Sequence, residues 1–272
     1  MKSELPASLE NALIRSIDFF FRVWPQPHPG SNRLKACKIV SHRGEHNNQN
    51  VFENTIEAFD LARDKGIWGI EFDIRWTKDL HPVVVHDPDL KRVFGIDSMI
   101  SKLTRSELKS CCPAVPTLSK IIERYGQKLH LMIEIKSEDY PDPEMQNRIL
   151  ENCLSSLAPR QDYHLMSLTP AMFDLISFVP PSVFIPIATL NVSQFSKLAL
   201  EKNYCGMAGH YLLLNSSKIA KHHKKGQNVG TGYPESKKCL FREINRGVEW
   251  IFSNNAGKLQ EIANTIADIN TR

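Results

Sequence analysis

The sequence predicts an α/β fold, a (β/α)8 barrel of the TIM type with an extra N-terminal helix and a short hairpin after the second strand. Strand-like and helix-like segments alternate from residue 38 to the C-terminus, and eight such pairs can be distinguished. The chain has 272 residues, close to the roughly 250 residues that such a barrel occupies as one domain. Hydrophobic residues make up 42% of the chain, which is ample for its core.

The eight expected strands are short apolar runs rich in β-branched residues. In chain order they are residues 38–41, 67–74, 129–135, 163–168, 183–190, 204–209, 228–231 and 249–252. Residues 82–86 also have strand character, but only seven residues separate them from Ile74. A parallel crossover needs about a dozen residues or more. Residues 82–86 are therefore expected to return antiparallel, as a hairpin over the barrel mouth.

Capping residues predict where the intervening helices begin and end. Asn54 is expected to cap the first of them, with Glu57 three residues on and Gly66 at its end. Pro170 is expected to occupy the first position of another helix. Asn215 is expected to cap a third.

The chain is expected to divide into residues 1–29, an amphipathic helix and linker, and residues 30–272, the single barrel domain. The amphipathic stretch, residues 8–24, ends in three phenylalanines and a tryptophan, and it could lie on a membrane surface. Packing against the domain is the commoner use of such a helix. Acidic residues at positions 4, 10 and 18 argue against a signal peptide. No apolar run approaches the roughly 20 residues of a membrane span.

Charge and cysteine usage favour a cytoplasmic protein. The formal net charge of +4 is mild and does not by itself indicate a nucleic acid or a membrane as partner. The six cysteines have no spacing typical of a zinc site. They are expected to be reduced, as in a cytosolic protein. Peripheral membrane contact through residues 8–24 stays open as an alternative.

Two carboxylate-bearing pairs lie at the ends of expected strands, as Glu71-x-Asp73 and Glu134-x-Lys136. Side chains two residues apart on a strand point the same way, so each pair faces one site. Buried charges are costly unless they are paired or bound to a metal. Three carboxylates without a cysteine suit one hard divalent cation, Mg²⁺ or Ca²⁺, rather than zinc.

Two histidines complete this set, His42 after the first strand and His86 at the end of the hairpin segment. With Arg43 and Lys136, the three carboxylates and one divalent cation carry a charge of +1, which one phosphodiester monoanion would neutralise. Taken singly, each residue is more often structural than functional. Their shared position at the C-terminal ends of barrel strands favours acid–base chemistry on a phosphate ester.

Six short motifs follow one another over residues 42–136. They are His42-Arg43-Gly44, Glu53-Asn54-Thr55, Glu71-x-Asp73-x-Arg75-x-Thr77-Lys78-Asp79, Val84-Val85-His86-Asp87, Pro116-Thr117-Leu118 and Glu134-Ile135-Lys136. In kind and order they resemble the glycerophosphodiester phosphodiesterase family. The resemblance is dense from about residue 38 to 137 and looser to residue 257, and residues 1–36 lie outside it.

The resemblance implies a set of ligands for the cation and the substrate. The cation would be held by Glu71, Asp73 and Glu134. The substrate phosphate would be held by Arg43 and Lys136. The implied substrate is a small-molecule glycerophosphodiester, hydrolysed to sn-glycerol 3-phosphate and an alcohol, with no nucleic acid involved.

The resemblance also implies that His42 and His86 are the acid–base pair and that Glu53 supports the site from behind. In such enzymes the glycerol hydroxyl is thought to attack the phosphorus, giving a cyclic phosphate that water opens. His42 is assigned as the first base and His86 as the first acid, although the sequence leaves that direction open. The two rings are expected to face each other across the cation.

Several positions depart from the family pattern. They are Phe52, Leu80, Gly230-Thr231-Gly232 and Ser253-Asn254-Asn255, where the family commonly has proline, glycine, a tryptophan-threonine-valine-asparagine run and threonine-aspartate. None removes a candidate catalytic group, but all bear on substrate identity. Two alternatives therefore stay open: an enzyme acting on lysophospholipids or sphingolipids at a membrane, and a barrel that binds phosphodiesters without catalysis.

Overall fold

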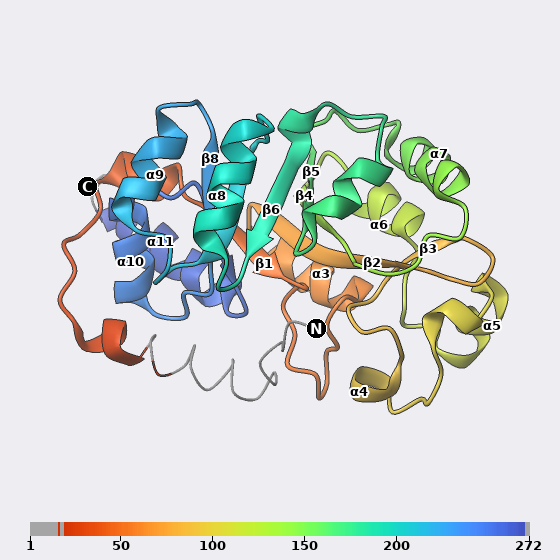
Figure 1. Cartoon of the computed structure of the whole chain (residues 1–272). Helices are drawn as coiled ribbons and strands as arrows, with labels where there is room; N and C mark the ends of the chain where they lie inside the picture. The colour runs from red at the N-terminus through yellow and green to blue at the C-terminus, as the bar shows by residue number, and fades with distance from the viewer. Residues whose placement is uncertain (1–15, 17–18, 270–272) are drawn as a thin grey trace.

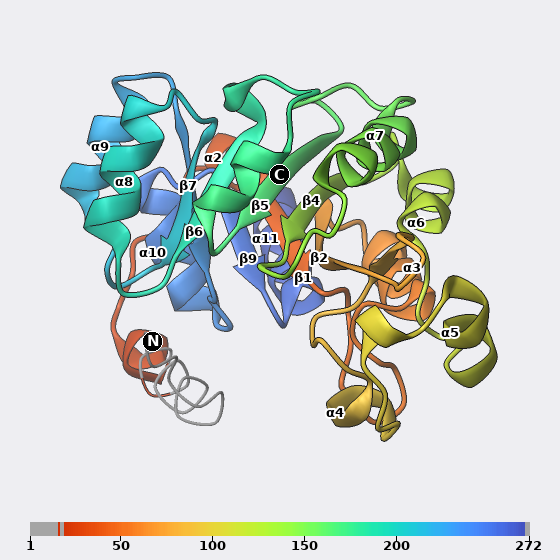
Figure 2. The ribbon, with the colours of Figure 1, turned by 45° about the vertical axis from the view of Figure 1, so that its right-hand side comes forward.

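The computed structural model describes Ser16 and residues 19–269 of the chain. Eight parallel strands close into a barrel with helices around it (Figures 1 and 2). The ring consists of β1 (Lys38–His42), β2 (Gly69–Trp76), β4 (His130–Ile135), β5 (Tyr163–Ser167), β6 (Phe184–Ala188), β7 (Gly206–His210), β8 (Asn228–Gly232) and β9 (Trp250–Ser253). It closes because β1 pairs with both β2 and β9. The predicted (β/α)8 barrel is confirmed.

The ninth strand, β3 (Pro82–Val84), lies outside the ring and runs antiparallel to β2, with Val84 opposite Ile74. The predicted hairpin is therefore confirmed. The segment that follows forms α4 (Lys91–Phe94), η1 (Ile100–Lys102) and α5 (Arg105–Cys111) to one side of the barrel (Figures 1 and 2). It has a small core of its own, made of Val83, Val85, Leu90, Ile100, Leu108, Cys112 and Val115.

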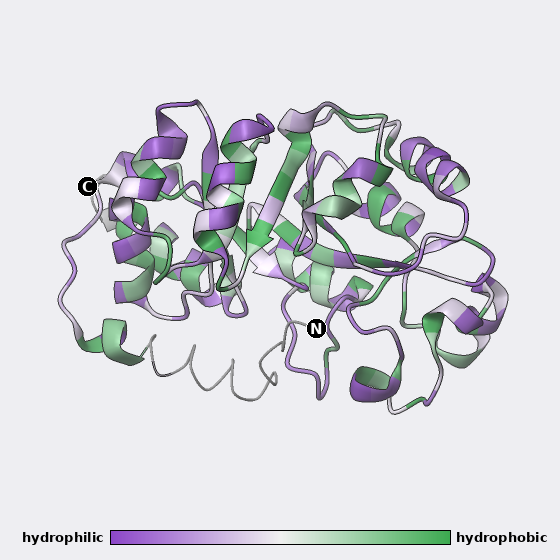
Figure 3. Ribbon diagram, viewed as in Figure 1, coloured by the Kyte–Doolittle hydropathy of each residue, from purple (hydrophilic) through white to green (hydrophobic). Residues whose placement is uncertain are grey.

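The remaining helices cover the outside of the barrel. They are α2 (Ser31–Lys35), α3 (Ile56–Asp64), α6 (Leu118–Tyr125), α7 (Pro143–Leu154), η2 (Pro170–Leu175), η3 (Pro181–Val183), α8 (Val192–Glu201), α9 (Ser216–His223), α10 (Lys237–Arg246) and α11 (Ala256–Ile269). Hydrophilic residues colour the outer turns of α7 and α9, whereas β6 is mostly hydrophobic (Figure 3). This is the pattern expected where each helix buries one stripe against the strands.

One predicted helix start is wrong in detail. Thr55, not Asn54, caps α3, and its hydroxyl accepts a hydrogen bond from the amide of Ala58. Asn54 instead has a φ of +58° and donates its side-chain amide to Asp73 at 2.9 Å. Asparagine tolerates this left-handed conformation, so a side chain on β2 can draw it away from the helix. The predicted start at Pro170 is confirmed, since this proline begins a six-residue 3-10 helix.

Only part of the expected amphipathic stretch, residues 8–24, lies within the described residues. Residues 19–23 are helical, and Phe21 packs against Tyr211 and under the guanidinium of Arg242, at 5.8 and 4.3 Å. The side chains of the other apolar residues here are exposed, namely Phe19, Phe20, Val23 and Trp24. In the described part of the chain, no helix is both long and apolar enough to cross a membrane. The division at residues 29 and 30 stays a prediction.

A capping box at the start of α5 allows a test of local stability away from the strand ends. The hydroxyl of Thr104 accepts from the amide of Glu107, whose carboxylate accepts from the amide of Thr104 in return. Thr104→Ala is expected to lower the free energy of unfolding by about 1 kcal/mol, because one helix amide loses its acceptor. Thr104→Ser, which keeps the hydroxyl, is the matched control. Equal urea midpoints for the two variants would contradict this account.

Candidate active site

Register brings the predicted site residues together at the C-terminal ends of β1, β2 and β4. His42, the last residue of β1, lies opposite Glu71 on β2. Asp73, two residues further along β2, lies opposite Glu134 on β4. Lys136 follows β4 directly. Backbone pairing therefore makes neighbours of His42 and Glu71, and of Asp73 and Glu134. The three carboxylates face one point because side chains alternate in the same phase along paired strands.

The three carboxylates form a buried cluster. One ligand oxygen from each of Glu71, Asp73 and Glu134 lies within 4.8 Å of the others. Their exposed fractions are 2%, 0% and 7%. Burial first, and then the charges of Asp73 and Glu134, raise the pKa of Glu71 well above its usual range. One oxygen of Glu71 is buried without a hydrogen-bond partner in the described structure, and Oδ1 of Asp73 has only an ion pair with Lys136 at 3.2 Å. A buried, unpartnered oxygen among converging carboxylates fits a hard divalent cation such as Mg²⁺ or Ca²⁺.

Two cations flank this cluster. The ammonium of Lys136 donates to Glu134 at 2.7 Å and lies 3.2 Å from Asp73. The Nε of Arg43 lies 3.4 Å from the other oxygen of Asp73. Burial opposes ionisation of Asp73, but Lys136 and Arg43 outweigh it and hold its pKa far below the usual range. Asp73 is therefore a carboxylate at neutral pH even without a bound metal.

His42 is held in one orientation by side chains from two strands. Its Nδ1 makes a 2.7 Å hydrogen bond to Oδ1 of Asn254, which follows β9. Its Nε2 lies 3.7 Å from Glu71, and its ring packs against Tyr233 at 4.8 Å between centroids. Burial, helped by the charge of Arg43, lowers the pKa of His42 to about 3. A neutral ring that donates from Nδ1 leaves Nε2 as a proton acceptor.

His86 follows the hairpin strand and is held from two sides. Its Nδ1 makes a 2.7 Å hydrogen bond to the carboxylate of Asp87. Its carbonyl accepts a 2.7 Å hydrogen bond from Arg75 on β2, which is itself paired with Glu138 at 2.8 Å. The side chain is 30% exposed, so one face of the ring is open to solvent.

A chain of ion pairs links the neighbours of the two histidines. Asp87 pairs with Arg92 on α4 at 2.5 Å, and Arg92 pairs with Glu53 at 2.7 Å. Glu53 in turn pairs with Arg43 at 2.9 Å. Burial opposes the charge of Glu53, but the hydrogen bonds from Arg92 and the charge of Arg43 lower its pKa to about 2. Glu53 therefore lies behind Arg43, where the sequence places it.

Two residues of the site were not among the predicted site residues. Arg92 gave no signal, because its role depends on α4 folding back beside Glu53. Asn254 departs from the family pattern, but only the closure of the barrel places it against His42. Leu80, a second departure, occupies the turn between β2 and β3 with a φ of +58°, a conformation that glycine adopts without strain.

Fold and site together define a TIM barrel with a candidate divalent-cation site, two cations and one histidine at the C-terminal ends of its strands, and a second histidine on the hairpin after β2. The family model "Glycerophosphoryl diester phosphodiesterase family" matches residues 42–219. The chain therefore belongs to the glycerophosphodiester phosphodiesterase family.

Curated relatives match less than half of this chain. A glycerophosphodiester phosphodiesterase from Caldanaerobacter subterraneus subsp. tengcongensis is 34% identical over 125 residues, 42% of this chain and 51% of the relative. One from Bacillus altitudinis is 32% identical over 127 residues, again 42% of this chain and 51% of the relative. The chain thus spans about half the length of these relatives.

Solved structures share the whole fold at low identity. A glycerophosphodiester phosphodiesterase from Thermotoga maritima has a TM-score of 0.67 and 23% identity, covering 83% of this chain and 98% of its own. An Oleispira antarctica phosphodiesterase, solved with the product sn-glycerol-3-phosphate, has a TM-score of 0.68 and 20% identity, covering 84% and 96%. At these identities the likeness shows the fold alone.

Proposed function

We propose that this protein is a metal-dependent phosphodiesterase that hydrolyses glycerophosphodiesters to sn-glycerol 3-phosphate and an alcohol. The observation that carries the proposal is the strand register that sets His42 beside Glu71 and Asp73 beside Glu134 in one buried cluster. Membership of the family supports the same activity. The product complex of the Oleispira phosphodiesterase supports the identity of the product.

Substrate binding is assigned to the charged residues around the cluster. Glu71, Asp73 and Glu134 would hold one divalent cation, Mg²⁺ or Ca²⁺. When bound, that cation would polarise the phosphoryl oxygens. Arg43 and Lys136, each already within 3.4 Å of an oxygen of Asp73, would hold the phosphate of the substrate. This arrangement stabilises the charge that builds up on the phosphoryl oxygens in the transition state.

Proton transfer is assigned to the two histidines. Because the Nδ1–H of His42 is donated to Asn254, Nε2 is free to take the proton of the attacking glycerol hydroxyl. The P–O bond to the leaving alcohol breaks as the new P–O bond forms, and His86, oriented by Asp87, gives that alcohol a proton. Water then opens the cyclic phosphate with the two roles reversed.

A product screen tests the proposed activity. Glycerophosphocholine, glycerophosphoethanolamine and glycerophosphoglycerol are incubated with the protein and Mg²⁺ or Ca²⁺, and sn-glycerol 3-phosphate is measured by an enzyme-coupled assay. The expected result is this product, with the free alcohol, from at least one substrate. Binding of the diesters without turnover would instead support the barrel that only binds phosphodiesters.

Exposed apolar side chains favour a second candidate, an enzyme that acts on lysophospholipids or sphingolipids as a peripheral protein of a membrane surface. Phe19, Phe20, Val23 and Trp24 are exposed on and beside the N-terminal helix, and further exposed leucines follow β5, β6 and β7, namely Leu168, Leu190, Leu212 and Leu213. Apolar side chains at the same end of the barrel as the cluster would suit a lipid tail. Co-sedimentation with liposomes is expected to fall on removal of residues 1–28. Equal sedimentation of both proteins would count against this candidate.

Asn254→Asp tests the role of His42 through the pH dependence of kcat/KM. A carboxylate at Nδ1 favours the protonated ring, so the pKa of His42, about 3 here, is expected to rise. The acidic limb, where a protonated base is inactive, should therefore move to higher pH by about one unit or more. Asn255→Asp adds the same charge on an exposed neighbour and should leave the limb in place. The same limb in both variants would exclude His42 as the base.

A further inference from the structure

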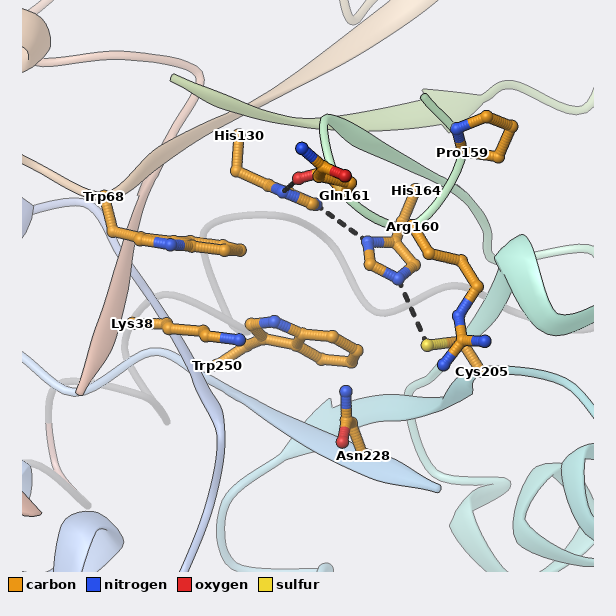
Figure 4. A pocket seen from close by; sticks show the side chains of 10 residues that line it. All are labelled: Lys38, Trp68, His130, Pro159, Arg160, Gln161, His164, Cys205, Asn228 and Trp250. Atoms are coloured by element: carbon orange, nitrogen blue, oxygen red, sulfur yellow. Dashed lines mark hydrogen bonds between the residues drawn. The ribbon is translucent and has the colours of Figure 1, made fainter. Parts of the chain in front are cut away.

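A cavity of about 510 Å³ opens at the N-terminal end of the barrel (Figure 4). Four strands begin at its walls, with Lys38 in β1, His130 in β4, Asn228 in β8 and Trp250 in β9. Residues 159–161, which precede β5, form its rim. The candidate active site lies where these strands end, so this space, which we call the floor cavity, is separate from it.

The floor cavity carries two cations without a carboxylate partner. Within the described residues, neither Lys38 nor Arg160 makes a salt bridge, and Arg160 is directed at the thiol of Cys205 instead. Two acids lie nearby, but neither forms an ion pair with these cations. Asp162 accepts a 2.7 Å hydrogen bond from the amide of Ala158, and Glu249 lies 2.9 Å from His223. Two cations without an ion-pair partner in one concave space offer charged hydrogen-bond donors to an anion.

A directed hydrogen-bond chain keeps the rest of the floor uncharged. Nδ1–H of His130 donates to the carbonyl of Gln161 at 3.0 Å, so its Nε2 accepts from His164 at 2.7 Å. Nε2 of His164 then accepts the thiol proton of Cys205 at 3.1 Å. Burial lowers the pKa of His130 to about 4, and burial with the charge of His130 lowers that of His164 to about 2. Both rings are thus neutral, and the positive charge belongs to Lys38 and Arg160.

Two tryptophans complete the walls. Trp68 stacks on His130 at 4.3 Å between centroids, and the ammonium of Lys38 lies 5.1 Å from the Trp68 ring. Trp250 is 1% exposed, and its indole N–H is buried with no acceptor in the described structure. In the view of Figure 4, Trp250 lies between Lys38 and Arg160. An unsatisfied buried donor is costly, so a ligand that offers acceptor oxygens here would remove that cost.

We propose that the floor cavity binds a small molecule bearing a phosphate monoester. Two cations match a dianion better than a single carboxylate, and the guanidinium of Arg160 suits the paired oxygens of a phosphate. The volume of about 510 Å³ lies within the roughly 300–1,000 Å³ of small-molecule sites and exceeds the need of inorganic phosphate alone. The tryptophan walls would contact the remainder of the molecule. The same two cations disfavour a metal ion at His164 and Cys205.

Calorimetric titration of the full chain, loaded with Mg²⁺, with inorganic phosphate at low ionic strength tests this. Two sites are expected, one at the floor and one in the candidate active site. The double variant Lys38→Gln with Arg160→Gln should lose the floor site, with binding there at least ten-fold weaker, while its turnover of glycerophosphodiesters stays unchanged. Lys136→Gln should lose the other site instead. Phosphate binding at the floor cavity and phosphate binding in the candidate active site are measured separately. Failure of the floor-cavity proposal would therefore leave the proposed activity untouched, and the reverse also holds.

A second double variant, Lys102→Gln with Arg148→Gln, removes the same charges from exposed positions and should keep both sites. Arg160→Gln alone, at an exposed rim residue, guards against a folding defect and should weaken the floor site by itself. Unchanged phosphate binding in the Lys38 and Arg160 variants, or a wild-type protein with only the site that Lys136→Gln removes, would overturn the proposal. Acetate binding as tightly as phosphate would overturn the assignment to phosphate monoesters.

Discussion

His42→Ala and His86→Ala are each expected to lower kcat for glycerophosphodiester hydrolysis by about 10²- to 10⁴-fold, the range for loss of a general acid or base. In the proposed mechanism, Nε2 of His42, which lies beside Glu71, accepts the first proton, and His86, hydrogen-bonded to Asp87, donates a proton to the leaving oxygen. Steady-state kinetics with the preferred diester, together with circular dichroism to confirm folding, measures the effect. His81→Ala, at a half-exposed histidine bonded to its own turn, is the matched control.

The double variant is expected to lose little more than the worse single one, because the histidines serve the same proton transfers and residues that act as a unit are not additive. The cyclic phosphate provides a second readout. If the two roles reverse in the second step, neither variant should hydrolyse added cyclic glycerophosphate. Full activity of either folded single variant would exclude the two-histidine mechanism.

Removal of divalent cations is expected to abolish activity, and re-addition of Mg²⁺ or Ca²⁺ to restore it. The physical reason is the buried cluster of Glu71, Asp73 and Glu134, whose oxygens converge on one point where they would hold the cation. Binding should also show in stability, independently of activity. A ligand at 100 times its Kd stabilises the folded state by about 2.7 kcal/mol. A rise in Tm on adding metal to chelated protein measures this.

Glu71→Gln is expected to have opposite effects on the two states. Burial raises the pKa of Glu71 in the folded, metal-free protein. The stability that this side chain contributes is therefore fully present below its pKa in the unfolded chain, and it is lost as pH rises through its pKa in the folded protein. Glutamine carries no such charge, so the variant should be more stable than the wild type in chelator at neutral pH, yet show no rise in Tm with metal. Glu123→Gln, at an exposed helix position, should change neither. A variant that still gains stability from metal would remove Glu71 from the ligand set.

The hairpin after β2 shows what the local sequence pattern could predict. Residues 82–86 could be assigned antiparallel because seven intervening residues cannot form a parallel crossover. Pairs such as Glu71 and Asp73 could be placed on one face because side chains alternate along a strand. The orientation of Asn54 could not be predicted. Its amide serves Asp73, a residue nineteen positions away, and that contact exists only after β2 is in place.

Chain order, strand alternation and the motifs determined the barrel, the hairpin and every candidate ligand and histidine of this protein. These properties are local, since they depend on residues a few positions apart. The tertiary structure alone decided that Asn254 orients His42 across 212 residues, that Arg92 connects Asp87 to Glu53, and that Lys38 and Arg160 share one cavity at the opposite end. The Arg92 contacts depend on α4 folding back beside Glu53. The other two depend on the closed barrel, whose ring is completed between β1 and β9 and brings together residues that no sequence spacing relates.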